Sequence, residues 1–254
     1  MEKSVLKVVK VMELPVAFNV CNQTLREVVQ TPSFSVAHVI MEPGARSILH
    51  KHESFSELYY ILRGKGVLYS GSKAYNVARG SYVVIPPNTP HMLHNDDQRL
   101  AHLVLASPPF NPKDVILMEN DDYVKSPPKK FLRRIPTIVA QDGATIKELL
   151  TEEEIKITGI SLALGGLDKG RKAVMHRHEE AEEVYYIVGG KGKVTIGKLT
   201  QDISPDTVAY VPRGTNHSLE NLSTDSKLTV LCISSPPYKD KDFIPVTKVA
   251  SSNP

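Results

Sequence analysis

Apolar and β-branched residues recur along the chain in short runs, separated by Gly, Pro or Asn, at spacings of roughly 8–12 residues. The clearest runs are residues 35–41, 57–62, 81–86 and 100–106 in the first half and residues 161–166, 183–188, 208–212 and 228–234 in the second half. Val, Ile, Leu and Tyr dominate these runs. The pattern predicts an all-β protein built from sandwiches or barrels.

The second half of the chain repeats the first. Residues 44–95 align with residues 170–221 without a gap at an offset of 126, and 17 of these 52 positions are identical. The segment ELYYILRGKG lies over EVYYIVGGKG, and SPPF near residue 107 matches SPPY near residue 235. A self-match of this length indicates a tandem duplication.

The repeat also sets the expected domain boundaries. We predict an N-terminal barrel over residues 1–123, a linker over residues 124–134 and a C-terminal barrel over residues 135–254. The linker contains the basic stretch KSPPKKFLRR, which we interpret as a solvated connection between domains. A nucleic-acid patch is the alternative, but no aromatic residues interleave with these charges.

A short helix is expected to open each unit. Thr24 and Glu27, and likewise Thr145 and Glu148, have the spacing of a capping box just before apolar residues. The sequence thus predicts two tandem all-β barrels or sandwiches with short helices.

Composition excludes several function classes. The 254 residues are 41% hydrophobic and 23% charged, as in ordinary soluble globular proteins. A formal net charge of +3 favours neither nucleic acid nor a membrane surface. Cys21 and Cys232 form no CxxC pattern, which argues against a disulfide framework or a thiolate zinc site. No secretory leader and no apolar run of about 18 residues is found, so we expect a cytoplasmic protein.

The histidines carry the strongest functional signal. His50, His52, Glu57 and His91 in the first unit recur as His176, His178, Glu183 and His217 in the second. Residues i and i+2 of a strand point to the same side, so both imidazoles of an HxH pair can reach one point. Three imidazoles and one carboxylate suit a divalent first-row metal such as Fe, Mn, Ni, Zn or Co. The sequence therefore predicts one metal per domain.

These residues give the chain a resemblance to the cupin superfamily. Its first motif, G-x5-H-x-H-x(3,4)-E-x6-G, is matched from Gly44 to Gly64 and from Gly170 to Gly190. Its second motif, G-x5-P-x-G-x2-H-x3-N, is matched from Gly80 to Asn95 and from Asp206 to Asn221, with one substitution in each copy. The resemblance covers most of both halves and implies a bicupin of two tandem jelly-roll-type barrels, with a metal near the mouth of each barrel.

Two positions depart from the motifs. Asn88 and Asp206 each replace a motif glycine. Both residue types tolerate positive φ better than most, so we expect both turns to be kept.

Oxalate decarboxylases are one group of bicupins, and they carry an arginine three residues before the HxH pair. Ser47 and Ala173 hold those places here. The resemblance therefore does not extend to oxalate as the substrate.

Further candidates for catalysis follow from strand alternation. A regular strand would place Arg46 on the face of His50 and Lys172 on the face of His176, where a cation would bind a substrate carboxylate or phosphate. A solvated charge is the alternative. Tyr59 and Tyr185, two residues beyond the glutamates, are expected to face inward as acid, base or hydrogen-bonding group, or as packing.

Three histidines lie outside the ligand sets, all in the first unit. His38 is a candidate catalytic base, and Leu164 occupies its place in the second unit. His94 and His102 are expected to be exposed.

Two functions are compatible with this sequence. One is a metalloenzyme acting on a small oxygen-bearing and potentially anionic metabolite, by dioxygenase-type or by isomerase, decarboxylase or lyase chemistry. The other is a non-catalytic cupin that binds or stores a small ligand or a metal. Neither a nucleic-acid nor a membrane partner is expected. Sheet edges need cover, so the two units are expected to pair, and a homo-oligomer is also compatible.

Overall fold

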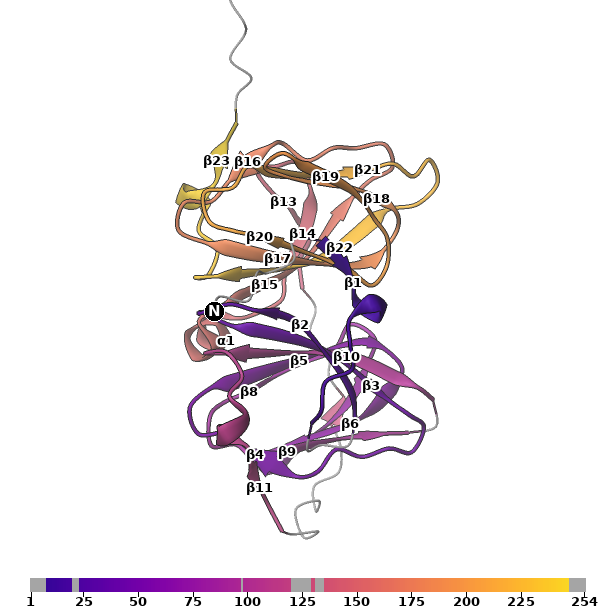
Figure 1. Cartoon of the computed structure of the whole chain (residues 1–254), viewed down its shortest axis with the longest axis vertical. Helices are drawn as coiled ribbons and strands as arrows, with labels where there is room; N and C mark the ends of the chain where they lie inside the picture. Colours follow the sequence, from indigo (N-terminus) through magenta and orange to yellow (C-terminus); the bar gives the residue numbers. More distant parts are fainter. Residues whose placement is uncertain (1–7, 20–22, 97, 120–128, 131–134, 247–254) are drawn as a thin grey trace, which may run out of the picture. The chain divides into compact units, whose positions relative to one another are not determined.

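The computed structural model describes residues 8–19, 23–96, 98–119, 129–130 and 135–246. It divides into two units (Figure 1). We call residues 11–134 with 152–159 the N-terminal barrel, and residues 1–10 with 135–151 and 160–254 the C-terminal barrel. The predicted linker, residues 124–134, lies outside the described residues except for Lys129 and Lys130.

The N-terminal barrel consists of two sheets. One has the order β2-β3-β10-β5-β8, where the strands are Thr24–Gln30, Ser35–Met41, Leu100–Ser107, Ser56–Arg63 and Tyr82–Ile85. The other has the order β11-β4-β9-β6-β7-β12, where the strands are Ile116–Leu117, His50–Lys51, His91–Asn95, Lys65–Ser70, Lys73–Ala78 and Lys129–Lys130. The helical elements are η1 (Val11–Glu13), η2 (Pro112–Asp114) and α1 (Glu152–Thr158).

The C-terminal barrel repeats this plan. One sheet has the order β1-β20-β17-β22-β15-β14-β13, where the strands are Val8–Lys10, Thr207–Val211, Glu182–Gly189, Leu228–Ser235, Ser161–Leu167, Thr145–Glu148 and Ile138–Val139. The other has the order β19-β18-β21-β16-β23, where the strands are Leu199–Ile203, Gly192–Ile196, His217–Asn221, His176–Arg177 and Ile244–Pro245. A 3₁₀ helix, η4 (Asp240–Asp242), precedes β23.

Each barrel has elements from both halves of the sequence. β1, at the start of the chain, pairs antiparallel with β20 in the C-terminal barrel. The helix α1, from the second sequence repeat, packs on β5 in the N-terminal barrel. Neither assignment is visible in the repeat pattern, because β1 and α1 lie outside the aligned motifs.

The core of each barrel lies between its two sheets. In the N-terminal barrel, Val39, Ile61 and Leu100 from one sheet pack against Leu68 and Leu93 from the other, and all are essentially buried. Alternation along the strands sends these side chains inward, as the apolar runs predicted. Truncating a buried leucine such as Leu93 to alanine costs about 2–5 kcal/mol in comparable cores. The all-β, two-barrel prediction is confirmed.

The short helices expected at residues 24 and 145 are absent. Thr24–Gln30 forms β2, which pairs with β3, and Thr145–Glu148 forms β14, which pairs with β15. The helix prediction was wrong because a capping box stabilises only the four residues at the start of a helix. A sheet edge offers the same backbone groups a ladder of hydrogen bonds, and the β-branched residues here favour it. The one α-helix among the described residues, α1, begins a few residues after β14.

The two motif substitutions behave as expected. Asn88 has φ of 61° and its equivalent Gly214 has φ of 68°, while Asp206 has φ of 62° and its equivalent Gly80 has φ of 85°. All four lie in the left-handed region, which Asn and Asp enter more readily than most residues. The turns are therefore kept without the motif glycine.

No helix among the described residues is long and apolar enough to span a membrane.

Candidate metal centres

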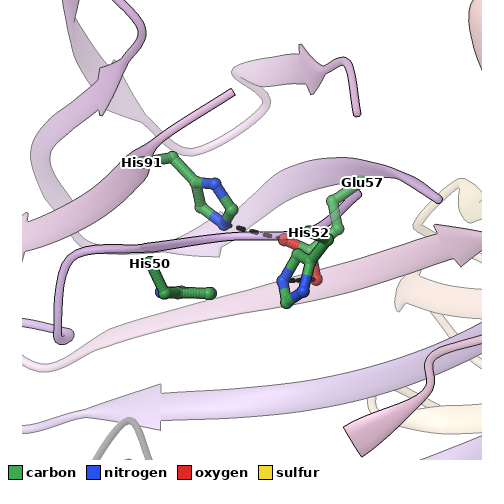
Figure 2. A group of neighbouring side chains, drawn as sticks. All are labelled: His50, His52, Glu57 and His91. Carbon is green, nitrogen blue, oxygen red and sulfur yellow. Dashed lines mark ion pairs between the residues drawn. The ribbon is translucent and has the colours of Figure 1, made fainter. Parts of the chain in front are cut away.

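In the N-terminal barrel, four predicted ligands meet at one point (Figure 2). His50 lies on β4 opposite His91 on β9, His52 follows β4 directly, and Glu57 lies on β5. Their donor atoms all lie within 4.8 Å of one another, and all four residues are buried. Residues from both sheets of the barrel therefore converge inside it.

The C-terminal barrel builds the same cluster from equivalent elements. His176 on β16 lies opposite His217 on β21, His178 follows β16, and Glu183 lies on β17. These donor atoms also lie within 4.8 Å of one another and are buried. The structure thus brings together both ligand sets that the sequence predicted.

Backbone carbonyls set the tautomer of every histidine in the two clusters. In the N-terminal cluster, the Nδ1 atoms of His50, His52 and His91 lie 2.8, 2.9 and 2.9 Å from the backbone carbonyl oxygens of Ile48, Asp114 and Thr89, respectively. In the C-terminal cluster, the Nδ1 atoms of His176, His178 and His217 lie 2.8, 3.0 and 2.9 Å from the backbone carbonyl oxygens of Val174, Asp242 and Thr215, respectively. A carbonyl only accepts, so each Nδ1 carries the proton and donates it. The lone pair of each Nε2 is left for the centre of the cluster, as in histidines that bind metals.

The inner atoms of the N-terminal cluster fit a cation. His91 Nε2 lies 2.9 Å from Glu57 Oε2, and His52 Nε2 lies 3.5 Å from Glu57 Oε1. Among the described residues, His52 Nε2, His91 Nε2 and Glu57 Oε2 are buried without a hydrogen-bond partner. Lone pairs and a carboxylate facing one another away from water are costly unless a positive charge lies between them. The three-histidine, one-glutamate set therefore fits a divalent metal ion.

The pKa values of two ligand histidines and one ligand glutamate favour their metal-binding forms near neutral pH. Burial, together with the neighbouring histidines, lowers the pKa of both His50 and His176 to about 4, although the glutamates oppose this. Burial by itself would raise the pKa of Glu183, but the hydrogen bond and charge of His217 outweigh it and bring this pKa to about 2. His50 and His176 are thus neutral and Glu183 is ionised, as metal binding requires. Burial would lower the pKa of His217, but its hydrogen bond and charge interaction with Glu183 raise it, so a metal ion has to displace a proton from His217 Nε2.

Two aspartates support the clusters and were missed in the sequence. The Asp114 carboxylate accepts backbone N–H groups of Glu53 and Ser54, at 3.0 and 2.8 Å. The Asp242 carboxylate accepts those of residues 179, 180 and 181, at 2.9, 3.0 and 3.1 Å. Each aspartate thus holds the loop between the HxH pair and the glutamate, while its carbonyl orients a ligand. The available signal was their equal distance from the SPP segments, in SPPFNPKD and SPPYKDKD.

The two candidate cations do not reach the clusters. Arg46 is exposed and lines a groove of about 1090 Å³ with Ile48 and His94, outside the ligand set. Lys172 is 56% exposed and pairs with Glu220 at 3.5 Å. The reason is local: β4 begins only at His50 and β16 only at His176, so the preceding residues do not follow strand alternation.

The two candidate tyrosines are buried inside their barrels. The Tyr185 hydroxyl donates to Glu183 Oε2 at 2.8 Å, and burial followed by the charge of Glu183 raises its pKa well above the usual value. The Tyr59 ring lies edge-on to His91, with centroids 5.9 Å apart. Both side chains therefore contact the ligand sets, and their catalytic roles stay predictions.

The remaining histidines have different surroundings. His38 is buried opposite Leu103, on the sheet face away from Val39 and the barrel core, so it is not brought to the cluster. The expectation that His102 is exposed was wrong. This side chain is fully buried and stacks on Tyr59 at 5.0 Å, since register with Val39 and Ile61 turns it inward.

Two antiparallel barrels, each with a buried three-histidine, one-glutamate cluster, define a bicupin. The cupin domain model (Cupin_2) matches residues 37–107 and again residues 164–234, and the chain belongs to this family.

Two relatives share part of the sequence. Uncharacterized protein MJ1618 of Methanocaldococcus jannaschii is 34% identical over 109 residues, which cover 43% of this chain and 86% of that protein. Uncharacterized protein SCO3923 of Streptomyces coelicolor is 34% identical over 98 residues, which cover 39% of this chain and 85% of that protein. Both matches involve less than half of the duplicated chain.

Solved structures share the whole fold. The oxalate decarboxylase of Lactobacillus farciminis, in complex with formate, superposes with a TM-score of 0.74 at 15% identity, covering 98% of this chain and 91% of that one. The oxalate decarboxylase of Bacillus subtilis at pH 4.6 gives a TM-score of 0.71 at 16% identity, covering 92% and 77%. At these identities the likeness establishes the bicupin architecture and no particular activity.

Proposed function

We propose that this bicupin is a divalent-metal-dependent enzyme that acts on a small, oxygen-bearing metabolite. The observation that carries the proposal is the orientation of the ligand histidines. Six Nδ1–H groups are bound by backbone carbonyls, which leaves six Nε2 lone pairs directed at two buried carboxylates. Such preorganisation is expected of a site built to hold a cation with positions left open.

Each cluster supplies three neutral donors and one negative charge. With a divalent ion the site carries one net positive charge, which favours an anionic or enolisable ligand. The bound metal would polarise a carbonyl, enolate or carboxylate oxygen of that ligand. The chain's own residues would hold the ion, exclude bulk water by burial and keep the carboxylate ionised.

The substrate class we propose is a small carboxylate or hydroxy-carbonyl compound other than oxalate. The fold neighbours are oxalate decarboxylases, which supports a small anion. Ser47 and Ala173 replace the arginine of that group; both are buried, and neither offers a cation. Ser47 instead accepts the backbone N–H of Leu93 at 2.9 Å. Recognition of a carboxylate would therefore rest on the metal.

The reaction type depends on the ion held. With iron we propose dioxygenase chemistry, and with manganese, nickel, zinc or cobalt a non-redox isomerisation, decarboxylation or elimination. Metal content measured by mass spectrometry on untagged protein decides between them. About two equivalents are expected, with one equivalent left in each of the variants His50→Ala/His52→Ala and His176→Ala/His178→Ala.

A second candidate is a non-catalytic metal- or ligand-binding cupin. Two observations favour it: the interior hydroxyl of Tyr185 is engaged with Glu183, and both candidate cations lie outside the clusters. Oxygen-uptake assays and a screen of small carboxylates and hydroxy-carbonyl compounds separate the two. Turnover that disappears in one double-histidine variant supports the enzyme. Full metal loading with no turnover across the screen supports the binding protein.

A further inference from the structure

The two carboxylate ligands occupy equivalent places but are held differently. In the C-terminal barrel, Ser234 on β22 lies directly opposite Glu183 on β17. Its hydroxyl donates to Glu183 Oε1 at 3.0 Å, and the Tyr185 hydroxyl donates to Oε2 at 2.8 Å. Both oxygens of this carboxylate therefore have a hydroxyl donor.

The N-terminal barrel lacks one of these donors by sequence. Ala106 on β10 lies directly opposite Glu57 on β5, in the place of Ser234. A methyl group cannot donate a hydrogen bond. Glu57 Oε2 is buried with no hydrogen-bond partner among the described residues. The carboxylate of Glu57 is therefore less constrained than that of Glu183.

The two carboxylates also turn differently toward the histidines. Glu57 presents one oxygen to each of two ligands, Oε1 to His52 Nε2 at 3.5 Å and Oε2 to His91 Nε2 at 2.9 Å (Figure 2). Glu183 presents a single oxygen to both equivalents. Its Oε2 lies 3.6 Å from His178 Nε2 and 3.1 Å from His217 Nε2. Its other oxygen is turned to Ser234.

We propose that Ser234 is a positioning residue that makes the C-terminal centre the tighter of the two divalent-metal sites. This inference rests on the proposed metal binding and deepens it. A carboxylate already held in one orientation loses less conformational freedom when it binds an ion. The Glu57 carboxylate, without the serine, must be ordered by the ion itself. The N-terminal centre is then the one that releases its metal first.

The test measures the affinity of each centre separately with Co²⁺ as the probe. The variant His50→Ala/His52→Ala retains the C-terminal centre, and His176→Ala/His178→Ala retains the N-terminal one. Titration of the metal-free proteins against a competing chelator is expected to give a dissociation constant about 10–100-fold lower for the C-terminal centre, the range that partners of metal ligands contribute.

Reciprocal substitutions assign the difference to the hydroxyl. Ser234→Ala, in the variant with only the C-terminal centre, is expected to weaken Co²⁺ binding about tenfold or more and to change the visible absorption of the bound ion. Ser234→Thr restores the hydroxyl and should restore both. Ala106→Ser, in the variant with only the N-terminal centre, should tighten binding. Circular dichroism melting of each metal-free variant controls for the fold.

Two results would overturn the inference. One is equal affinity of the two single-centre variants, and the other is a Ser234→Ala variant that binds Co²⁺ as tightly as its parent. Neither measurement uses turnover, so the test of the inference is independent of the proposed catalytic activity. Unequal Co²⁺ affinities without turnover would support the inference and not the proposed activity. Equal Co²⁺ affinities with turnover would refute the inference and leave the proposed activity standing. Absence of Co²⁺ binding at both centres would refute it together with the proposed metal dependence.

Discussion

The backbone carbonyl of Asp242 accepts the Nδ1–H of His178 at 3.0 Å, while the carboxylate of the same aspartate binds three successive backbone N–H groups after that histidine. One residue thus orients a ligand and holds the loop that leads to Glu183. Asp114 repeats this arrangement for His52 with two N–H groups. Neither aspartate is itself a ligand.

Replacing Asp242 by alanine should therefore lower both stability and metal affinity. Three N–H groups, one buried and two partly buried, would lose their acceptor, and we expect a loss of about 1–3 kcal/mol in the free energy of unfolding. Asp114→Ala is the matched control and should cost less, because Asp114 is more exposed and accepts fewer N–H groups. Urea denaturation of the two metal-free variants measures the loss of stability in each, and Co²⁺ titration measures the loss of metal affinity. An equal or larger loss in Asp114→Ala would contradict the argument.

The metal-free protein should lose stability as the pH falls below 6.5. The pKa of His50 and of His176 is lowered from 6.5 to about 4, so the unfolded chain binds protons in this window that the folded chain does not. More protons on the unfolded state mean that the free energy of unfolding decreases as the pH drops from 6.5 to about 4. Below pH 4.5, protonation of Glu183, whose folded-state pKa is about 2, adds to the loss. Denaturant titrations at pH 7.5, 6.5, 5.5 and 4.5 check this, and a flat profile would contradict it.

His102→Val is expected to leave the fold at least as stable. Both ring nitrogens of His102 are buried with no hydrogen-bond partner among the described residues, and Val230 fills the equivalent register position in the other barrel. Removing such an unsatisfied polar group is expected to stabilise the barrel by about 1 kcal/mol at pH 7.

The gain from His102→Val should grow at pH 5. Burial lowers the pKa of His102 to about 3, so protonation of this histidine favours the unfolded wild-type chain below pH 6.5. Urea titrations at the two pH values test this. A loss of stability in the variant would show that the imidazole makes a needed interaction.

Gly64→Ala should cost far more than Gly44→Ala. Both glycines have positive φ, 81° and 71°, so both variants lose about 1–2 kcal/mol from backbone strain. A Cβ on Gly64 would also lie 2.7 Å from the carbonyl oxygen of Arg99, whereas a Cβ on Gly44 meets nothing within 4 Å. Thermal melting compares the two. Similar melting temperatures would contradict this and mean that the segment around Arg99, which leads into β10, shifts easily.

The sequence revealed the fold and the ligands because each depends on short-range or repeated patterns. Strand alternation marked the core, and the duplication of His50, His52, Glu57 and His91 made chance histidines improbable. Arg46 and Lys172 were misplaced because the segments before the HxH pairs are not regular strands. The position of His102 depended on cross-strand register, which cannot be inferred from residue spacing along the chain.

The donors around each glutamate were equally hidden. Ser234 lies 51 residues from Glu183 along the chain, and only the pairing of β17 with β22 brings the two together. Asp114 and Asp242 could have been noticed from their matched distance after the SPP segments. The amino-acid sequence did not indicate that either aspartate contacts a ligand histidine, because the contact is made by the backbone carbonyl of the aspartate.

The pairing of β1 with β20 has a consequence for how the chain reaches its native state. Val8 is synthesised about two hundred residues before its partner Ala209. Closing a loop of that length is slow compared with forming local hairpins. Nascent β1 therefore has to wait until β20 has been synthesised. The C-terminal barrel should complete its sheet last, with the β20 edge open until then, and a chaperone that shields sheet edges would help most at that stage.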